Sequence, residues 1–496
     1  MPVCRHLLFT FTLAAAGVAA SAHARQGDPP YSLVHPAKAG ANVPIVDVET
    51  LDPERERHGQ ASRKNGDVVD KRLRSARATA ASVTTDRDGR WDRLDDGSEL
   101  WRASVRASGA TDLRLGLARL ALPEGATLHV IGADGYYQGP YTARDAVRGS
   151  LSLPVVPGDT ATLELRLRAG TARDAAAIEL ADVGAGFLDL FARRTPKAST
   201  GLGASGACNI DVACPLGDAY PDEIRATGHY EFRSGGNYYI CTGTLLADVP
   251  RDRRNLFLTA NHCIANASEA ASIVVYWNYQ STRCGSLAAP AGGWLDDNQQ
   301  GASLRATRAD TDVTLLELDD APDPAWNLFH AGWDATGTTP GATIGIHHPL
   351  GDAKKITAGP RPTTMGNCIA GGTSASHWRA GPYSQGTTEG GSSGSALFAA
   401  QGGSNARQVI GILSGGSAAC STLTPSQPND GYDCYGKLSA SWDGASAGAR
   451  LRDWLDPQGS GTRSVTGIDH DDAQEPDDEP PARTLPRDLL HSRHRR

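Results

Sequence analysis

Alternating hydrophobic and polar residues mark a series of short segments in the first half of the chain. The segments LWRASVRA, LRLGLARLAL, TLHVIGADG and ATLELRLRAG begin at residues 100, 113, 127 and 161. Each switches between apolar and polar residues and is bounded by Gly, Pro or Asp, which is typical of half-buried antiparallel strands. We therefore predict a β-sandwich over about residues 98–190. The preceding residues 25–80 are polar and charged with little periodicity, and we expect them to be flexible.

Three apolar runs in the second half border residues that could do chemistry. NLFLTANHCIA contains His262, DTDVTLLELDD contains Asp312, and TTEGGSSGSALF contains Ser393. Each has an ordinary explanation when it is taken alone: a hydrogen-bonded structural His, a solvated Asp, and a flexible Gly-Ser turn. None of the three predicts a site by itself.

The N-terminus predicts export. A short basic start is followed by an apolar run over residues 7–20 and by the small-residue ending Ala22-His23-Ala24. This is the pattern of a secretory signal peptide over residues 1–24. The apolar run is shorter than the roughly 20 residues that a membrane span needs. We therefore expect a secreted protein with no membrane partner.

The cysteines divide the chain. Of the 9 cysteines, Cys4 belongs to the signal peptide, and the other eight lie between Cys208 and Cys434. An even number in an exported protein predicts four disulfides. The net charge of -8 argues against a nucleic-acid partner, because phosphate binding favours basic surfaces. The predicted division is a signal peptide 1–24, a propeptide 25–202 that ends in a processing linker 191–202, a main domain 203–466, and a disordered tail 467–496.

Together, His262, Asp312 and Ser393 predict acyl transfer. A serine nucleophile needs a base within hydrogen-bond reach and a carboxylate that orients the base. Glycines beside the serine let backbone N–H groups face a developing oxyanion. Gly390 to Gly394 also fits the G-x-S-x-G pattern of α/β-hydrolases, with Ser392 at its centre. That fold places its acid and histidine after the serine, and only tail histidines follow here, so a lipase or esterase is excluded.

The motifs resemble those of the chymotrypsin-like serine proteases. LTANHC is similar to the LTAAHC signature of that family, CTGTLL to CGGSL, DVTLLEL to DITLLKL, GSSGS to GDSGG, and VIGILSGG to VGIVSWG. The resemblance implies an all-β fold, a double six-stranded antiparallel β-barrel with a C-terminal helix. It also implies Ser393 as nucleophile and the N–H groups of Gly391 and Ser393 as oxyanion hole. The implied edge for the substrate backbone is formed by Ser414, Gly415 and Gly416.

Within that family, residues 203–457 resemble the bacterial lysyl endopeptidases. The shared stretches include ACNIDVACP, ASIVVYWNYQST, NLFHAGWD, IHHP and RLRDWLDP, which have no catalytic reason to match. One departure is that Ser414 stands where the best-known members carry His. The disulfides that the resemblance implies are Cys208–Cys420, Cys214–Cys284 and Cys241–Cys263, and the remaining Cys368 and Cys434 would pair with each other.

The specificity pocket is expected to hold one acid. Thr387 stands where trypsin places its pocket Asp, six residues before the serine. The stretch YDCYGKL matches the D-x-Y-G-[RK] context of the lysyl endopeptidases and nominates Asp433, with Asp430 as a nearby alternative. A buried, unpaired carboxylate favours a cationic substrate side chain. The resemblance favours Lys, and trypsin-like cleavage after Lys and Arg alike is the alternative.

We therefore expect a secreted serine endopeptidase that cleaves protein and peptide substrates after Lys and works as a monomer without cofactor or metal. The adjacent His347 and His348 would point to different faces of a strand and do not suggest zinc. The propeptide would act as folding aid and inhibitor, and release would follow a cut after Lys197 or a start at Gly203. The alternative from another class is a non-catalytic binding protein on a protease scaffold.

Overall fold

The computed structural model describes residues 27–37, 42–58, 64–65, 68–191, 203–290, 293–366, 368–369, 372–373 and 375–470. The expected signal peptide and Lys197 lie outside these residues. Among the described residues, no helix is long and apolar enough to cross a membrane.

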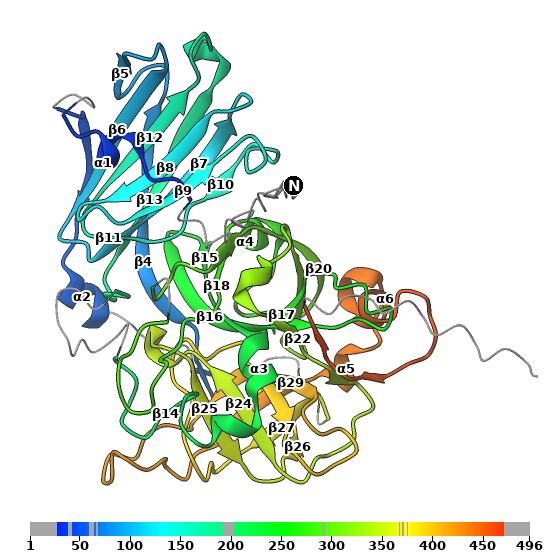
Figure 1. Cartoon of the computed structure of the whole chain (residues 1–496). Coiled ribbons are helices and arrows are strands. Elements are labelled where there is room, and N and C mark those ends of the chain that lie inside the picture. Colours follow the sequence, from blue (N-terminus) through cyan, green and yellow to red (C-terminus); the bar gives the residue numbers. More distant parts are fainter. Residues whose placement is uncertain are drawn as a thin grey trace, which may run out of the picture.

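The N-terminal module, residues 27–191, is a sandwich of two β-sheets (Figure 1). Its first sheet is ordered β1-β6-β12-β8-β9, with β5 paired to β6. The alternating segments form these strands because their apolar residues fill the space between the sheets, where Trp101, Leu128 and Leu163 are buried. The strands of this sheet are β1 (Ile45–Thr50), β5 (Arg90–Arg93), β6 (Glu99–Ser108), β8 (Thr127–Gly132), β9 (Tyr137–Tyr141) and β12 (Thr160–Leu167).

The second sheet of the sandwich continues into the C-terminal part, residues 203–470. Its order is β10-β7-β13-β4-β16-β15-β18-β19, and β17, β21 and β20 extend it from β16. The strands from the N-terminal module are β4 (Leu73–Thr84), β7 (Asp112–Ala121), β10 (Leu151–Ser152), β11 (Val156–Pro157) and β13 (Ala177–Gly186). Those from the C-terminal part are β15 (Thr227–Ser234), β16 (Asn237–Leu246), β17 (Leu256–Ala260), β18 (Val274–Tyr276), β19 (Asn298–Gln300), β20 (Ala302–Arg308) and β21 (Val313–Leu318).

Strand β4 joins the two parts, and it differs from the expectation for residues 25–80. It is the long blue strand between the sandwich and the strands below it in Figure 1. It pairs with β13 on one side and with β16 on the other. The flexible start that the polar composition predicted is therefore replaced by ordered strands β1 and β4, because neighbouring strands cover both edges of β4.

A third sheet forms the rest of the C-terminal part, ordered β14-β25-β24-β28-β29-β30-β27-β26. Its strands are β14 (Ile210–Asp211), β24 (Thr343–His347), β25 (Lys355–Gly359), β26 (Thr363–Met365), β27 (His377–Ala380), β28 (Ala396–Ala399), β29 (Val409–Gly416) and β30 (Asp433–Lys437). Short strands join it: β2 (Lys64–Asn65), β3 (Val68–Asp70), β23 (Trp333–Asp334) and β31 (Ser464–Val465). One hydrophobic core runs between this sheet and the strands β15–β21.

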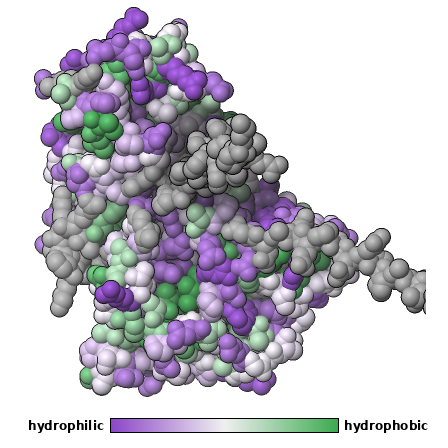
Figure 2. All heavy atoms as spheres, in the orientation of Figure 1, coloured by the Kyte–Doolittle hydropathy of each residue, from purple (hydrophilic) through white to green (hydrophobic). Residues whose placement is uncertain are grey.

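The α-helices of the described residues are short, with four to six residues each. They are α1 (Tyr31–Val34), α2 (Pro53–His58), α3 (Pro221–Ala226), α4 (Ala267–Ala271), α5 (Leu438–Ser441) and α6 (Arg452–Leu455). The expected C-terminal helix is thus the four-residue α6. Residues 468 and 469, which were expected to belong to the disordered tail, form β32 (Ile468–Asp469), and this strand pairs with β22 (Phe329–His330). The face seen in Figure 2 is largely hydrophilic or neutral, with hydrophobic residues in small separate groups.

A buried ion pair ties the two parts together. The guanidinium of Arg114 on β7 donates to both carboxylate oxygens of Glu231 on β15, with Nη2 2.5 Å from Oε1 and Nε 3.0 Å from Oε2. Ser75 of β4 donates to the same carboxylate. All three residues are buried. The ion pair therefore stabilises the contact between the N-terminal module and the C-terminal part only while each charge keeps its partner.

Candidate active site

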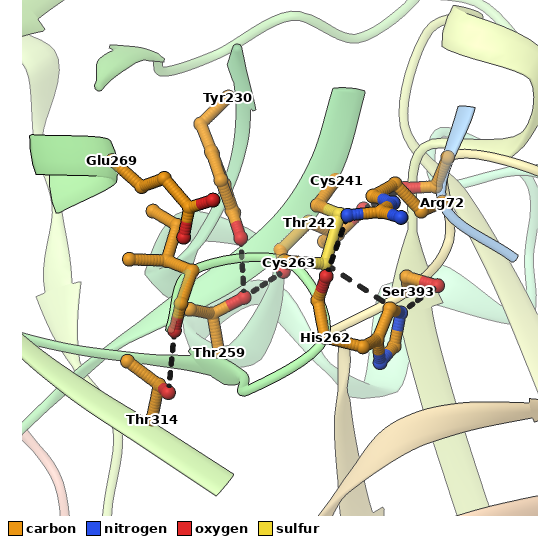
Figure 3. The surroundings of a disulfide bond; sticks show 12 residues. Arg72, Tyr230, Cys241, Thr242, Thr259, His262, Cys263, Glu269, Thr314 and Ser393 are labelled. Carbon is orange, nitrogen blue, oxygen red and sulfur yellow. Dashed lines mark hydrogen bonds between the residues drawn. A yellow bond between two sulfur atoms is a disulfide. The ribbon is translucent and has the colours of Figure 1, made fainter. Parts of the chain in front are cut away.

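His262 lies just beyond the end of β17. The disulfide Cys241–Cys263 ties its loop to β16 (Figure 3). The backbone N–H of Asn261 donates to the carbonyl of Asp312 at 3.0 Å, which anchors the loop from the other side. The position of the imidazole is therefore fixed by covalent and hydrogen-bonded neighbours rather than by its own contacts alone.

Asp312 immediately precedes β21, which pairs with β17 and so brings the acid beside His262. Its backbone φ is 56°, a left-handed conformation that is uncommon for a residue other than glycine. Its Oδ1 accepts the backbone N–H of His262 at 2.8 Å, and its Oδ2 lies 2.8 Å from His262 Nδ1. A carboxylate in this place holds Nδ1 protonated and leaves Nε2 free to accept a proton.

Ser393 completes the group from the loop before β28. Its Oγ lies 2.7 Å from His262 Nε2 (Figure 3). Thr242 of β16 holds the loop, because its N–H donates to the carbonyl of Ser393 at 2.8 Å and its hydroxyl to that of Gly391 at 3.0 Å. The three residues that the sequence singled out thus meet in the order Asp312, His262, Ser393, the geometry that serine-based acyl transfer needs.

Gly391 presents its backbone N–H beside Ser393. Its φ is +95°, and a Cβ there would lie 2.7 Å from the carbonyl oxygen of His348. Only glycine fits this conformation and this space. The N–H donates to the carbonyl oxygen of Lys71 at 2.5 Å. That the N–H of Ser393 acts as a second donor stays a prediction.

Asp433, the acid expected in the specificity pocket, opens β30 and is buried. Its Oδ2 accepts hydrogen bonds from Tyr383 Oη at 2.9 Å and from Thr388 Oγ1 at 2.6 Å. Burial, with the Asp433 carboxylate next to it, raises the pKa of Tyr383 well above its usual value, so this phenol remains a donor. The alternative residue Asp430 is exposed instead.

The pocket holds a lysine of the same chain. Lys71 Nζ lies 2.6 Å from Asp433 Oδ1, 2.9 Å from the carbonyl of Ala418 and 3.1 Å from that of Thr388. It also contacts the Thr388 hydroxyl. The ammonium group therefore faces four acceptor atoms from three residues, and one of these atoms is charged.

The expected edge for the substrate backbone lies on β29. Its residues Gly415 and Gly416 pair in an antiparallel ladder with Asp70 and Val69 of β3. Ser414 precedes them and is buried. The edge is thus occupied by the chain segment that leads to Lys71.

Sequence reasoning missed four contributors to the pocket: Thr388, Tyr383, Ala418 and Lys71. The first three approach Asp433 from distant parts of the chain, and no local pattern marks them. Lys71 carried a signal, because it is one of few lysines in a chain whose basic residues are mostly Arg.

Four disulfides are present. Three are the pairs that the resemblance implied, and the fourth joins the two remaining cysteines, as expected. They are Cys208–Cys420, Cys214–Cys284, Cys241–Cys263 and Cys368–Cys434. Within the described part of the chain, no three His, Cys, Asp or Glu side chains form a group that could hold a metal ion. His347 instead hydrogen-bonds Ser392, and His348 the carbonyl of Asp352.

Both the N-terminal module and the C-terminal part are similar to known proteins. Residues 202–436 match a model described as lysyl endopeptidase, C-terminal domain, and residues 47–184 match the lysyl endopeptidase N-terminal domain. A lysyl endopeptidase from Pseudomonas aeruginosa is 34% identical over 360 residues, which cover 70% of this chain and 74% of that protein.

Solved structures that match part of the chain include two proteases. One is an HtrA-type protease with a tripeptide (TM-score 0.30, 18% identity, 45% of this chain and 60% of that chain). The other is the protease Anisep from Arthrobacter nicotinovorans (TM-score 0.31, 15% identity, 44% of this chain and 91% of that chain).

The two family models and the relative from Pseudomonas aeruginosa define a serine endopeptidase. The chain belongs to the lysyl endopeptidase family, because two family models together match most of it and a relative above 30% identity covers more than two thirds of it.

Proposed function

We propose that this endopeptidase cleaves after Lys, with Ser393 as nucleophile, His262 as general base and Asp312 as the group that orients it. The observation that carries the proposal is a lysine ammonium held by Asp433 and by the carbonyl groups of Ala418 and Thr388. A protease of this type selects the residue before the scissile bond by such a pocket.

The proposed reaction follows from the contacts of the three side chains. Ser393 Oγ attacks the carbonyl carbon while its proton moves to His262 Nε2, which lies 2.7 Å away. Asp312 stabilises the resulting imidazolium through Nδ1. The N–H groups of Gly391 and Ser393 would stabilise the oxyanion, and one such donor is worth ~3 kcal/mol in the transition state.

The pocket favours Lys over Arg because of how Asp433 is already bonded. Tyr383 and Thr388 donate to Oδ2, which leaves Oδ1 for the substrate. A guanidinium prefers two parallel hydrogen bonds to both oxygens of a carboxylate, whereas an ammonium binds as a compact point charge. The carbonyls of Ala418 and Thr388 complete a site for the ammonium.

The chain is further proposed to be a secreted precursor that works as a monomer once matured. The basis for export is the signal-like residues 1–24 and the four disulfides, which persist in oxidising compartments. The N-terminal module is proposed as folding aid and temporary inhibitor. Release by a cut after Lys197, or a mature start at Gly203, is tested by N-terminal sequencing.

Two measurements on the mature protein test the function. Ser393→Ala should abolish both peptide cleavage and labelling by a serine-directed fluorophosphonate, because the nucleophile is removed. A peptide-library profile of the wild type should show Lys before the cleaved bond. Activity that survives Ser393→Ala would rule out the mechanism, and equal cleavage after Lys and Arg would favour the trypsin-like alternative.

A further inference from the structure

The segment from Val69 to Leu73 crosses the candidate site as a substrate would. Val69 and Asp70 pair with the β29 edge, and the carbonyl oxygen of Lys71 accepts the N–H of Gly391 at 2.5 Å. The Lys71 side chain fills the Asp433 pocket and is buried. The Lys71 carbonyl therefore lies where the proposed function needs the reacting carbonyl.

The chain beyond this carbonyl turns toward His262. The guanidinium of Arg72 donates to the His262 carbonyl at 2.9 Å (Figure 3). It also lies 4.4 Å from the ring centroid of Tyr239. The next residue, Leu73, is buried and pairs with Ile240 at the start of β4. The amine side of the Lys71–Arg72 bond is thus anchored by a strand that belongs to both parts of the molecule.

We propose that Lys71–Arg72 is a self-processing bond, and that the segment closes the site to other substrates while it is bound. The proposal rests on the proposed function. It differs from release near residue 200, because the chain on both sides of this bond belongs to the N-terminal region.

The step uses only groups of the chain and one water molecule. Ser393 Oγ adds to the Lys71 carbonyl carbon, and its proton passes to His262. The C–N bond then breaks as His262 returns the proton to the Arg72 nitrogen, which leaves an Arg72 amine and an ester between Lys71 and Ser393. Water hydrolyses the ester to a Lys71 carboxylate and the free serine hydroxyl.

The anchored amine makes this cut slow. Because β4 keeps the Arg72 amine beside the ester, the amine can attack it again and re-form the peptide bond before water reacts. We expect a nicked chain whose two pieces stay together, with Lys71 still in the pocket.

Mass spectrometry of the full chain, purified in denaturant and refolded, tests the cut. The wild type and the control Lys64→Ala, which changes a nearby lysine on β2, should yield a fragment that begins at Arg72. Lys71→Ala and Ser393→Ala should not. A wild-type chain that stays intact at this bond, while the mature enzyme cleaves Lys peptides, would overturn the proposal. A mature enzyme that cleaves no Lys peptide would instead refute the proposed function.

Fluorophosphonate labelling directly after refolding tests the closure. Removal of one partner from a buried charge pair weakens binding by about 30-fold or more. Lys71→Ala should therefore label Ser393 up to tens of times faster than the wild type, and Lys64→Ala should label at the wild-type rate. Equal rates for Lys71→Ala and wild type would show that the segment does not occupy the site.

Discussion

Replacement of Asp433 by Asn is the most direct perturbation of the pocket. Asp433 is 0% exposed, and its Oδ1 is 2.6 Å from a lysine ammonium. Asn keeps the shape and an oxygen acceptor but removes the charge, so a bound ammonium would be buried without its counter-ion. Breaking a buried ion pair in this way costs about 3–5 kcal/mol.

This cost predicts the size of the kinetic effect. At about 1.4 kcal/mol for each factor of ten, kcat/KM for Lys peptides should fall by about 10²- to 4 × 10³-fold. Peptides with a neutral residue at the same position place no charge near Asp433. Their kcat/KM should stay within a few-fold of the wild-type value. The preference for Lys over a neutral residue should therefore fall by nearly the same factor as kcat/KM for Lys peptides.

Paired fluorogenic peptides that differ only in the residue before the cleaved bond measure this preference. Mature wild type, Asp433→Asn and Asp430→Asn are compared at equal concentrations of active site, set by fluorophosphonate titration. Asp430 is exposed three positions earlier, so its variant should behave as wild type. If Asp433→Asn keeps the wild-type ratio of kcat/KM for Lys peptides to kcat/KM for neutral peptides, Asp433 does not recognise the charge of the substrate.

Three further changes test the loop, the clamp and a buried lysine. Gly391→Ala should lower kcat by about 10²- to 10³-fold, measured with Lys peptides, because its Cβ would lie 2.7 Å from the His348 carbonyl. Removing the disulfide Cys241–Cys263, whose cysteines are 22 residues apart, should lower the free energy of unfolding in urea by about 3 kcal/mol and should also lower kcat. Removing the control disulfide Cys214–Cys284 should lower stability with little change in kcat. Burial lowers the pKa of Lys354 to about 7, so above pH 7 the unfolded chain binds more protons than the folded chain. The free energy of unfolding, measured on the inactive variant Ser393→Ala, should therefore rise from pH 7 toward pH 10. The additional change Lys354→Met should flatten that rise.

The central site could be predicted because each of its residues sits beside a strand with a local signature. His262 follows β17, Asp312 precedes β21 and Ser393 precedes β28. Pairing of β17 with β21 sets the first two side by side. Each motif therefore predicted both a site residue and the strand beside which it lies.

The order of residues 73–84 could not be predicted from their composition. The stretch LRSARATAASVT holds few large apolar residues, so it gives little signal of a strand. Its stability comes from cross-strand pairing with β13 and β16, which buries small residues such as Ala76. Strand propensity of this kind is set by the neighbours rather than by the segment itself.

The placement of the lysines connects the pocket with the rest of the molecule. Lys354, Lys355 and Lys437, in the C-terminal part, are 1%, 6% and 7% exposed. Each donates to a neighbour, Lys354 to the Ile224 carbonyl, Lys355 to Asp211 and Lys437 to Thr364. A lysine can enter the pocket of a second copy only if it and its backbone leave such contacts, so these three are protected from an enzyme that cuts after Lys. A genome that favours Arg codons would explain why lysines are few, but it would not explain why these three donate to other neighbours while Lys71 is held by Asp433.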